Sequence, residues 1–194
     1  PSAASVCFEN LTRVAEFQLG DGVPTGPARE VSIPKWLSDT RTNATLEAVC
    51  IAPPTSPVAG STLLLTEGVI DNDGQHAAHL LGQNDKGPLS YISSDGTNPT
   101  DCAFLPNGDL LVLERGIALF TFHMRLKRVP AAEVKPGATM RGEVLLQATG
   151  GDIDNMEAVA VHTDPDGKTR ITLVSDNNFN DWERNLLLEF CLPE

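Results

Sequence analysis

Three segments of the chain resemble one another, and this internal repeat restricts the fold more than any other feature of the sequence. They are residues 46–68, 100–116 and 156–176. Each opens with an acidic residue and small or apolar residues, turns through a loop that contains proline, and continues in an apolar run that leads to Glu or Asp. The opening acids Glu47, Asp101 and Glu157 lie 54 and 56 residues apart. This period fits a four-stranded propeller blade, slightly longer than the roughly 40–50 residues of familiar propeller repeats.

The apolar runs favour strands that are covered on both faces. Three runs of about four residues show no alternation, and they are bounded by Gly, Pro, Asn or Asp, which is typical of buried strands rather than helices. They are residues 63–65, 110–113 and 186–188. The opening strands carry small residues instead, which fits innermost strands crowded around a central axis. These small residues are Ala48, Ala103, Ala158 and Ala160.

We therefore predict an all-β fold, with residues 1–194 forming a single domain that is part of a β-propeller. The blades are four-stranded antiparallel sheets that begin near Glu47, Asp101 and Glu157. No linker or change in composition divides the chain. Turns such as "PNGD" and "DPDG" supply the residues that tight hairpins need, and the helical signal is weak.

The number of strands predicts an incomplete ring. Before Glu47, residues 12–19 and 28–34 indicate the outer half of a blade whose two inner strands are absent. After Asp176, residues 185–192 supply one further strand. The total of about three blades falls short of the four or more that closure requires. We therefore expect missing N-terminal blades, a second chain or a homo-oligomer to complete the ring.

Charge and cysteine content exclude several classes of function. The net charge of −12 at pH 7 disfavours binding to nucleic acid and to anionic membrane surfaces. No run of about 18 apolar residues exists, so we expect no membrane insertion. The four cysteines form no Cys-x-x-Cys pair, and both alternatives stay open: disulfides, or small buried apolar side chains. The "HAAH" stretch at His76 has the spacing of a helical metal pair but no acidic partner at a recognised offset.

Converging inner strands would bring acidic residues to one end of a central channel. The acids are Glu47, Asp101 and Glu157 at the openings, and Glu67, Glu114 and Asp176 at the ends of the second strands. Crowded carboxylates raise one another's pKa unless a cation or an Arg lies among them, and oxygen ligands suit calcium or magnesium. The competing interpretation is that the acids pair with Arg115, Arg184 or loop donors to fix blade geometry. No nucleophile is readable, because Ser94 and Ser175 have no neighbouring His in the sequence.

The stretches "NGDLLVLERG", "DNMEAVAVH" and "SDNNFN" resemble the C-terminal half of the phytase-like β-propeller family, whose members are often labelled esterase-like activity of phytase. The resemblance runs from Glu47 to Phe190. It implies a six-bladed propeller, usually exported in bacteria and thus periplasmic or secreted, that hydrolyses phosphate or other esters. The motif positions that carry over are Glu47, Glu67, Glu114, Arg115, Asp154, Asn155, Glu157, Asp176, Asn177 and Asn178.

The leading hypothesis is a calcium-assisted phosphoric ester hydrolase, with a small-molecule ester or phosphate ester as substrate and magnesium as an alternative cation. The predicted catalytic residues are Glu157, Asp176 and Arg115. The predicted metal ligands are Glu47, Glu67, Glu114, Asp154, Glu157 and Asp176. The predicted substrate-binding residues are Arg115, Asn155, Asn177 and Asn178. Enzymatic activity itself stays open, because a non-enzymatic propeller that binds a partner, or a lactonase or carboxylic esterase, would have similar sequence features.

Overall fold

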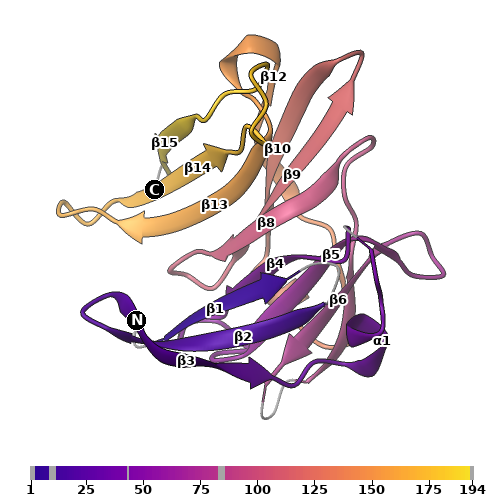
Figure 1. Cartoon of the computed structure of the whole chain (residues 1–194), viewed down its shortest axis with the longest axis vertical. Helices are drawn as coiled ribbons and strands as arrows, with labels where there is room; N and C mark the ends of the chain where they lie inside the picture. The colour runs from indigo at the N-terminus through magenta and orange to yellow at the C-terminus, as the bar shows by residue number, and fades with distance from the viewer. Residues whose placement is uncertain (1–2, 9–11, 43, 83–85, 193–194) are drawn as a thin grey trace.

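The computed structural model describes residues 3–8, 12–42, 44–82 and 86–192, which fold almost entirely into β-strands. These residues form four separate sheets, none of which closes on itself (Figure 1). The longest helix in them, α1 (Lys35–Ser38), is a single turn. No helix in the described ranges is long and apolar enough to cross a membrane. The all-β class predicted from the sequence is therefore confirmed.

The sheets follow one another along the chain. The first contains β1 (Ala3–Phe8), β2 (Arg13–Gly20) and β3 (Val23–Val31). The second contains β4 (Leu46–Ile51), β5 (Thr62–Ile70), β6 (His76–Leu81) and β7 (Gly87–Tyr91), with the short β11 (Thr139–Met140) added in parallel at its edge. The third contains β8 (Asn98–Phe104), β9 (Leu110–Ala118), β10 (Thr121–Val129) and β12 (Glu143–Thr149), and the fourth contains β13 (Met156–Thr163), β14 (Thr169–Ser175) and β15 (Leu187–Cys191). Of two 3-10 turns, η1 (Ala131–Glu133) follows β10 and η2 (Gly150–Asp152) follows β12.

The opening strand of each sheet lies beside the opening strand of the next. β1 packs against β4, β4 against β8, and β8 against β13 (Figure 1). A disulfide between Cys50 and Cys102 joins β4 to β8, with the two Cα atoms 6.0 Å apart. Between β8 and β13, Thr100 Oγ1 donates a hydrogen bond of 3.2 Å to the carbonyl oxygen of Met156. The sheets are therefore tied together along their inner strands.

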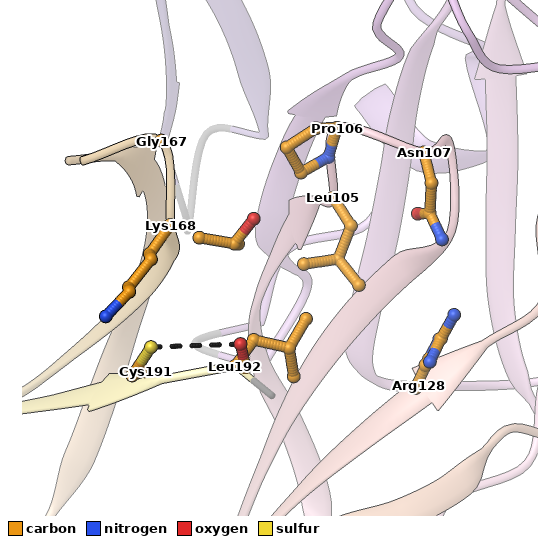
Figure 2. A pocket seen from close by; sticks show the side chains of 9 residues that line it. Leu105, Pro106, Asn107, Arg128, Gly167, Lys168, Cys191 and Leu192 are labelled. Carbon is orange, nitrogen blue, oxygen red and sulfur yellow. Dashed lines mark hydrogen bonds between the residues drawn. The ribbon is translucent and has the colours of Figure 1, made fainter. Parts of the chain in front are cut away.

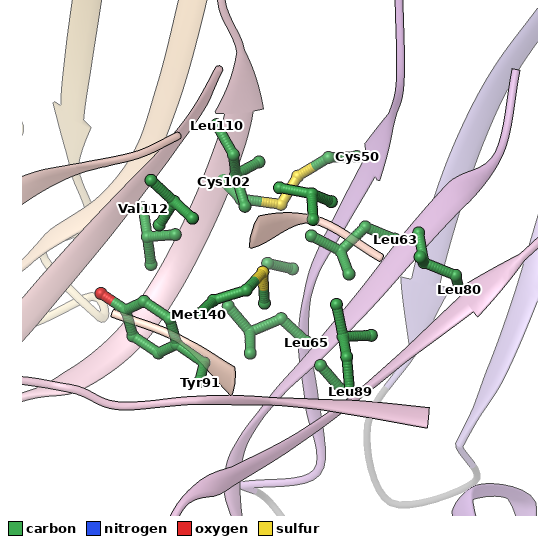
Figure 3. Close-up of a cluster of buried hydrophobic side chains, with 14 of the residues drawn as sticks. Cys50, Leu63, Leu65, Leu80, Leu89, Tyr91, Cys102, Leu110, Val112 and Met140 are labelled. Carbon is green, nitrogen blue, oxygen red and sulfur yellow. A yellow bond between two sulfur atoms is a disulfide. The ribbon is translucent and has the colours of Figure 1, made fainter. Parts of the chain in front are cut away.

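Three apolar clusters fill the three gaps between consecutive sheets. In β5, Leu63 and Leu65 belong to the cluster between the second and third sheets, whereas Leu64 belongs to the cluster between the first and second. Figure 3 shows the cluster between the second and third sheets, which contains Tyr91, Met140 and the two cysteines of the disulfide. β9 divides its apolar residues between two clusters in the same way. The expectation that unbroken apolar runs mark strands covered on both faces is confirmed for β5 and β9.

Two expectations about the outer sheets are wrong. The residues before Glu47 do not lack inner strands, because β1 occupies the innermost position of the first sheet. Its residues Ala3, Ala4 and Ser5 are small, as in the other inner strands. The described residues therefore form four sheets, where the sequence predicted about three blades. The run 186–188 is not covered on both faces: Leu187 is 69% exposed, because only one face of the fourth sheet packs against another sheet of the described chain.

Candidate functional site

Three inner strands each contain a one-residue bulge near their start. These bulges determine which side chains occupy corresponding positions in the different sheets. The extra residue inserted by the bulge is Glu47 in β4 and Glu157 in β13. In β8 the extra residue is Thr100, and Asp101 pairs one position further along. The counterpart of Glu47 and Glu157 in the third sheet is therefore Thr100, not the Asp101 expected from the spacing of the repeats.

The same offset of one residue applies to the second strands. Opposite the start of each bulge lies a buried polar residue, and these are Thr66, Glu114 and Ser175. The residues that follow them are Glu67, Arg115 and Asp176. Because successive strand residues face opposite sides of a sheet, these two sets have different surroundings. The second set, which contains Glu67, Arg115 and Asp176, thus combines two acids with one arginine, whereas the sequence repeats predicted an acid at each of the three positions.

Arg115 lies between carboxylates from the neighbouring sheets. Its Nη2 is 3.7 Å from Glu67 Oε1, and its Nε is 3.3 Å from Glu157 Oε1. Asn98, the cross-strand partner of Arg115, donates from Nδ2 to Glu67 Oε1 at 3.3 Å. Burial raises the pKa of the Glu157 carboxyl above its usual value; the Arg115 guanidinium opposes this rise, and the nearby carboxylates of Glu67 and Asp176 add to it. We call Glu67, Arg115 and Glu157 the arginine cluster.

Glu114, a predicted metal ligand, is fully buried and hydrogen-bonded to the protein. Its Oε1 accepts from the hydroxyl of Tyr91 at 2.5 Å, and its Oε2 accepts from Thr97 Oγ1 at 2.8 Å. The amide of Ser94 lies 3.2 Å from both oxygens, and Lys127 Nζ is 3.5 Å from Oε1. Burial and the adjacent carboxylate raise the pKa of Tyr91 above its ordinary value. Glu114 thus anchors the segment 94–97 from inside.

Asp154 and Asn155, predicted to bind metal and substrate, connect the start of β13 to its surroundings. Arg184 Nε donates to Asp154 Oδ2 at 3.0 Å, and the amide of Asn155 donates to Asp154 Oδ1 at 3.0 Å. Asn155 Nδ2 donates to the carbonyl oxygen of Asp176 at 3.1 Å, and the Asp176 amide donates to the carbonyl of Asn155 at 3.0 Å. Both carboxylate oxygens of Asp154 therefore have protein donors.

Asn177 and Asn178, predicted to bind substrate, form a tight turn after β14. Asn178 and Phe179 have positive φ angles of 48° and 56°, a conformation that Asn adopts more readily than most residues. The Phe179 amide donates to Asn177 Oδ1 at 3.2 Å, and Asn178 Nδ2 donates to Glu183 Oε2 at 3.1 Å. The Asn178 amide donates to Asp176 Oδ1 at 3.0 Å. Side chains of both asparagines therefore help to close this loop.

A protein-family model described as esterase-like activity of phytase matches residues 2–179 of the chain. The chain belongs to the phytase-like family. The resemblance expected from Glu47 onward therefore includes the first sheet as well. Neither the curated proteins nor the solved structures contain a match to the chain.

The donor set of this phytase-like chain does not fit a calcium ion as the described residues are arranged. In those residues, no three His, Cys, Asp or Glu side chains form a group that could hold a metal. Calcium takes roughly six to eight oxygen ligands, but a guanidinium lies between Glu67 and Glu157. Glu114 and Asp154 already accept hydrogen bonds from protein groups. Calcium and magnesium therefore stay predictions from the sequence.

A histidine and a serine that the sequence did not bring together lie next to the arginine cluster. His76 is the first residue of β6 and is only 4% exposed. Its Nε2 is 2.9 Å from Ser93 Oγ, and its Nδ1 is 2.6 Å from the carbonyl oxygen of Glu67. Burial lowers the pKa of His76 below its ordinary value, opposed by the hydrogen bond to Glu67 and by nearby carboxylates. Because His76 and His79 lie on a strand, they cannot form the helical metal pair that their spacing resembles.

Two hollows lie at opposite ends of β8. One of 570 Å³, lined by Gly74 and residues 92–98, precedes the strand and includes Ser93 and Asn98. The other, of 670 Å³, lies beyond the far end of β8, where the turn after that strand faces the β13–β14 hairpin and Cys191 (Figure 2). The larger hollow is remote from the arginine cluster, so the candidate site is identified by its chemistry rather than by size.

Proposed function

We propose that this chain is an esterase-like hydrolase that acts on carboxylic esters beside Arg115. The observation that carries the proposal is the loose pairing of this arginine. Its contacts of 3.3 and 3.7 Å with Glu157 and Glu67 exceed the roughly 2.7–2.9 Å of a charge-assisted hydrogen bond. By contrast, Arg128 Nε donates to Asp109 at 2.7 Å. An ester oxygen can therefore compete for the N–H groups of Arg115.

Glu157 complements the arginine as a group that exchanges protons. Its raised pKa keeps it protonated at a higher pH than an ordinary carboxyl group, which suits a general acid or base. In this proposal, Arg115 polarises the ester carbonyl and Glu157 exchanges a proton with the substrate or with water. Asp176 acts through its charge, because it helps to raise the pKa of Glu157.

A neutral carboxylic ester suits this site better than a phosphate ester. Two carboxylates flank the one guanidinium, the charge of Asp176 acts on Glu157 as well, and the whole chain carries a net charge of −12. An anionic phosphate would be repelled here unless a cation accompanied it. Calcium-assisted hydrolysis of phosphoric esters is the second candidate, because the matching family description names phytase. A binding module without catalysis is the outcome if neither ester class is hydrolysed.

We also propose that the chain is part of a β-propeller, that further chain segments complete the ring, and that the protein is periplasmic or secreted. The four inner strands lie side by side and the later strands of each sheet lie further out, which supports an arc of a β-propeller (Figure 1). Further blades or a second copy of the chain would close this ring. The Cys50–Cys102 disulfide supports a periplasmic or secreted location, because such bonds persist in oxidising compartments.

The test compares ester classes with and without calcium. 4-Nitrophenyl butyrate, a simple lactone, 4-nitrophenyl phosphate and phytate are each incubated with the protein in calcium or in EDTA. We expect turnover of the carboxylic ester in both conditions, and a fall of at least about tenfold in Arg115→Gln. Arg29→Gln is the matched control, because Arg29 forms an exposed ion pair with Glu16 in the first sheet. Turnover of phosphate esters alone, dependent on calcium, would favour the second candidate.

A further inference from the structure

His76, at the start of β6, is hydrogen-bonded to Ser93 in the arrangement that activates a serine. β6 and β7 are antiparallel, and His76 pairs with Tyr91, so the chain that continues beyond β7 brings Ser93 beside the His76 ring. The Nε2–Oγ distance is 2.9 Å and the distance from Nδ1 to the carbonyl oxygen of Glu67 is 2.6 Å. Both ring nitrogens of His76 therefore have fixed partners from two different segments.

These partners determine where the proton of the neutral imidazole lies. A carbonyl oxygen only accepts hydrogen bonds, so Nδ1 of His76 must carry the hydrogen that it donates to Glu67. Nε2 is then an acceptor, and the hydroxyl of Ser93 donates to it. This is the tautomer in which a histidine can remove a proton from a serine, and the backbone carbonyl takes the orienting role that a carboxylate has in a catalytic triad.

The serine is accessible, whereas its histidine partner lies behind it. Ser93 is partly exposed and lines the 570 Å³ hollow before β8. The adjoining turn is closed by the amide of Thr97, which donates to the carbonyl of Ser94 at 3.1 Å. Within the described part of the chain, the amides of Asp95 and Gly96 in this turn make no hydrogen bond. They are available to stabilise negative charge on an acyl oxygen bound in the hollow.

Glu114 gives the turn its fixed position. Its carboxylate accepts hydrogen bonds from the Ser94 amide and from Thr97 Oγ1, the two ends of the turn. Gly116 lies two residues further along the same face of β9, where any side chain would collide with the carbonyl of Gly96. The turn therefore packs against Glu114 and Gly116 of one strand, so the site is supported by a strand rather than by a free loop.

We infer that Ser93 is a nucleophile and His76 its general base, which gives the proposed ester hydrolysis, on which this inference rests, a covalent acyl-enzyme route. Ser93 Oγ bonds to the acyl carbon while its proton passes to His76 Nε2. The bond to the alcohol oxygen breaks, and the alcohol leaves with that proton. Water then attacks the acyl carbon and gives a proton to His76, which returns it to Ser93 Oγ as the carboxylic acid leaves. Ester and water are thereby converted to acid and alcohol.

Active-site labelling and turnover test the pair separately. An alkyl fluorophosphonate, which phosphonylates activated serines, is added to the full chain, and the modified peptide is located by mass spectrometry. We expect one label per chain, on Ser93, and none in Ser93→Ala or His76→Gln. For 4-nitrophenyl butyrate, Ser93→Ala should lower kcat at least about 100-fold with an unchanged circular dichroism spectrum.

Ser32→Ala is the matched control, because this serine is exposed, does not line the hollow and has a hydroxyl that forms no hydrogen bond in the described residues. It should keep turnover within about threefold of wild type. If Ser93→Ala hydrolyses the ester at the wild-type rate, or the label lies elsewhere, the nucleophile is wrong while ester hydrolysis stands. If wild type hydrolyses no carboxylic ester, the proposed function fails, and labelling at Ser93 still decides whether the serine is activated.

Discussion

Glu114 and Arg115 are consecutive residues of β9, yet they belong to two different regions of the molecule. Glu114 lies in the interior between the second and third sheets, fully buried, with donors from Tyr91, Ser94 and Thr97. Arg115 lies in the arginine cluster, 22% exposed, with longer contacts to carboxylates from the second and fourth sheets. The interior carboxylate is enclosed by protein donors, whereas the side chains of the cluster are partly exposed to solvent.

The position of a carboxylate relative to a bulge, rather than its residue type, therefore decides its role in this molecule. Glu67 and Glu114 both follow a leucine-rich run within their strands. Glu114 lies opposite the start of its bulge and Glu67 lies one residue beyond that position, so their side chains face opposite sides of their sheets. Glu67 thus belongs to the proposed site, whereas Glu114 holds the turn at residues 94–97. Variants on the two sides of this division should differ in stability, and Glu114 should show the largest effect.

Replacing Glu114 should destabilise the fold severely. Glu114→Ala leaves Lys127, whose side chain is only 7% exposed, without its buried partner, and removes the acceptor for three other donors. Breaking such a buried pair costs about 3–5 kcal/mol of unfolding free energy. Urea denaturation followed by fluorescence measures the loss. Glu16→Ala, which removes an exposed pair with Arg29, should cost less than about 1 kcal/mol. Equal losses in the two variants would contradict the division.

Asp101, one place beyond its bulge, should make stability depend on pH. Burial raises its pKa to about 6, although the amides of Val159 and Cys102 donate to it and oppose the rise. The folded chain then holds this proton more tightly than the unfolded chain, whose value is about 3.8. Its contribution to stability is therefore complete below about pH 4 and is lost as the pH rises through about 6.

Asp101→Asn removes this titration. We expect the unfolding free energy of wild type, relative to the variant, to fall by about 1–3 kcal/mol between pH 4 and pH 7. Denaturant titrations at four or five pH values measure the difference. Asp95→Asn, in an exposed turn, serves as the control. Parallel curves for wild type and Asp101→Asn would show that this carboxyl does not titrate as the structure indicates.

The sequence predicted where the strands lie but not their register. The openings near Glu47 and Glu157, the hairpin turns and the doubly buried runs of β5 and β9 were readable, because each depends on local residue patterns. Aligning the acids of the three repeats placed Asp101 and Glu114 at the end of the central channel. In the structure the bulge in β8 puts Thr100 and Arg115 at those positions, one residue away from the predicted acids. Gly68 and Gly116 carry the missing signal, since Glu67 and Arg115 each directly precede one of them.

The Ser93–His76 pair could not be read from spacing along the chain. These residues are 17 positions apart and match no nucleophile motif. Their contact arises because β6 and β7 form an antiparallel pair, in which His76 lies opposite Tyr91. Only a prediction of that pairing register would have placed residue 93 beside residue 76. Tertiary pairing, rather than local sequence, created this contact.

Breaking the arginine cluster should change stability little. Arg115 and its partners are partly exposed and their contacts are long, so solvent screens the pairs. Arg115→Gln and Glu157→Gln should each cost less than about 1 kcal/mol, and a double-mutant cycle should give a coupling energy below about 1 kcal/mol. Thermal and urea unfolding of the four proteins measure these values. A coupling energy above about 3 kcal/mol would place the cluster with the buried interior.

Calcium should have the smallest effect on the wild-type chain, and Arg115 is the reason. A ligand that binds only the folded state stabilises it by RT ln(1 + [L]/Kd), so weak binding gives almost no shift. With Arg115 between Glu67 and Glu157, we expect 1 mM calcium, compared with EDTA, to change the melting temperature by less than about 1 °C. In Arg115→Gln, Glu67 and Glu157 lose the guanidinium that lies between them, so calcium should then stabilise the fold measurably. Asp176→Asn in that background should reduce the gain. A rise of several degrees in wild type would mean that calcium displaces the guanidinium, and the metal site predicted from the sequence would then exist in the native protein.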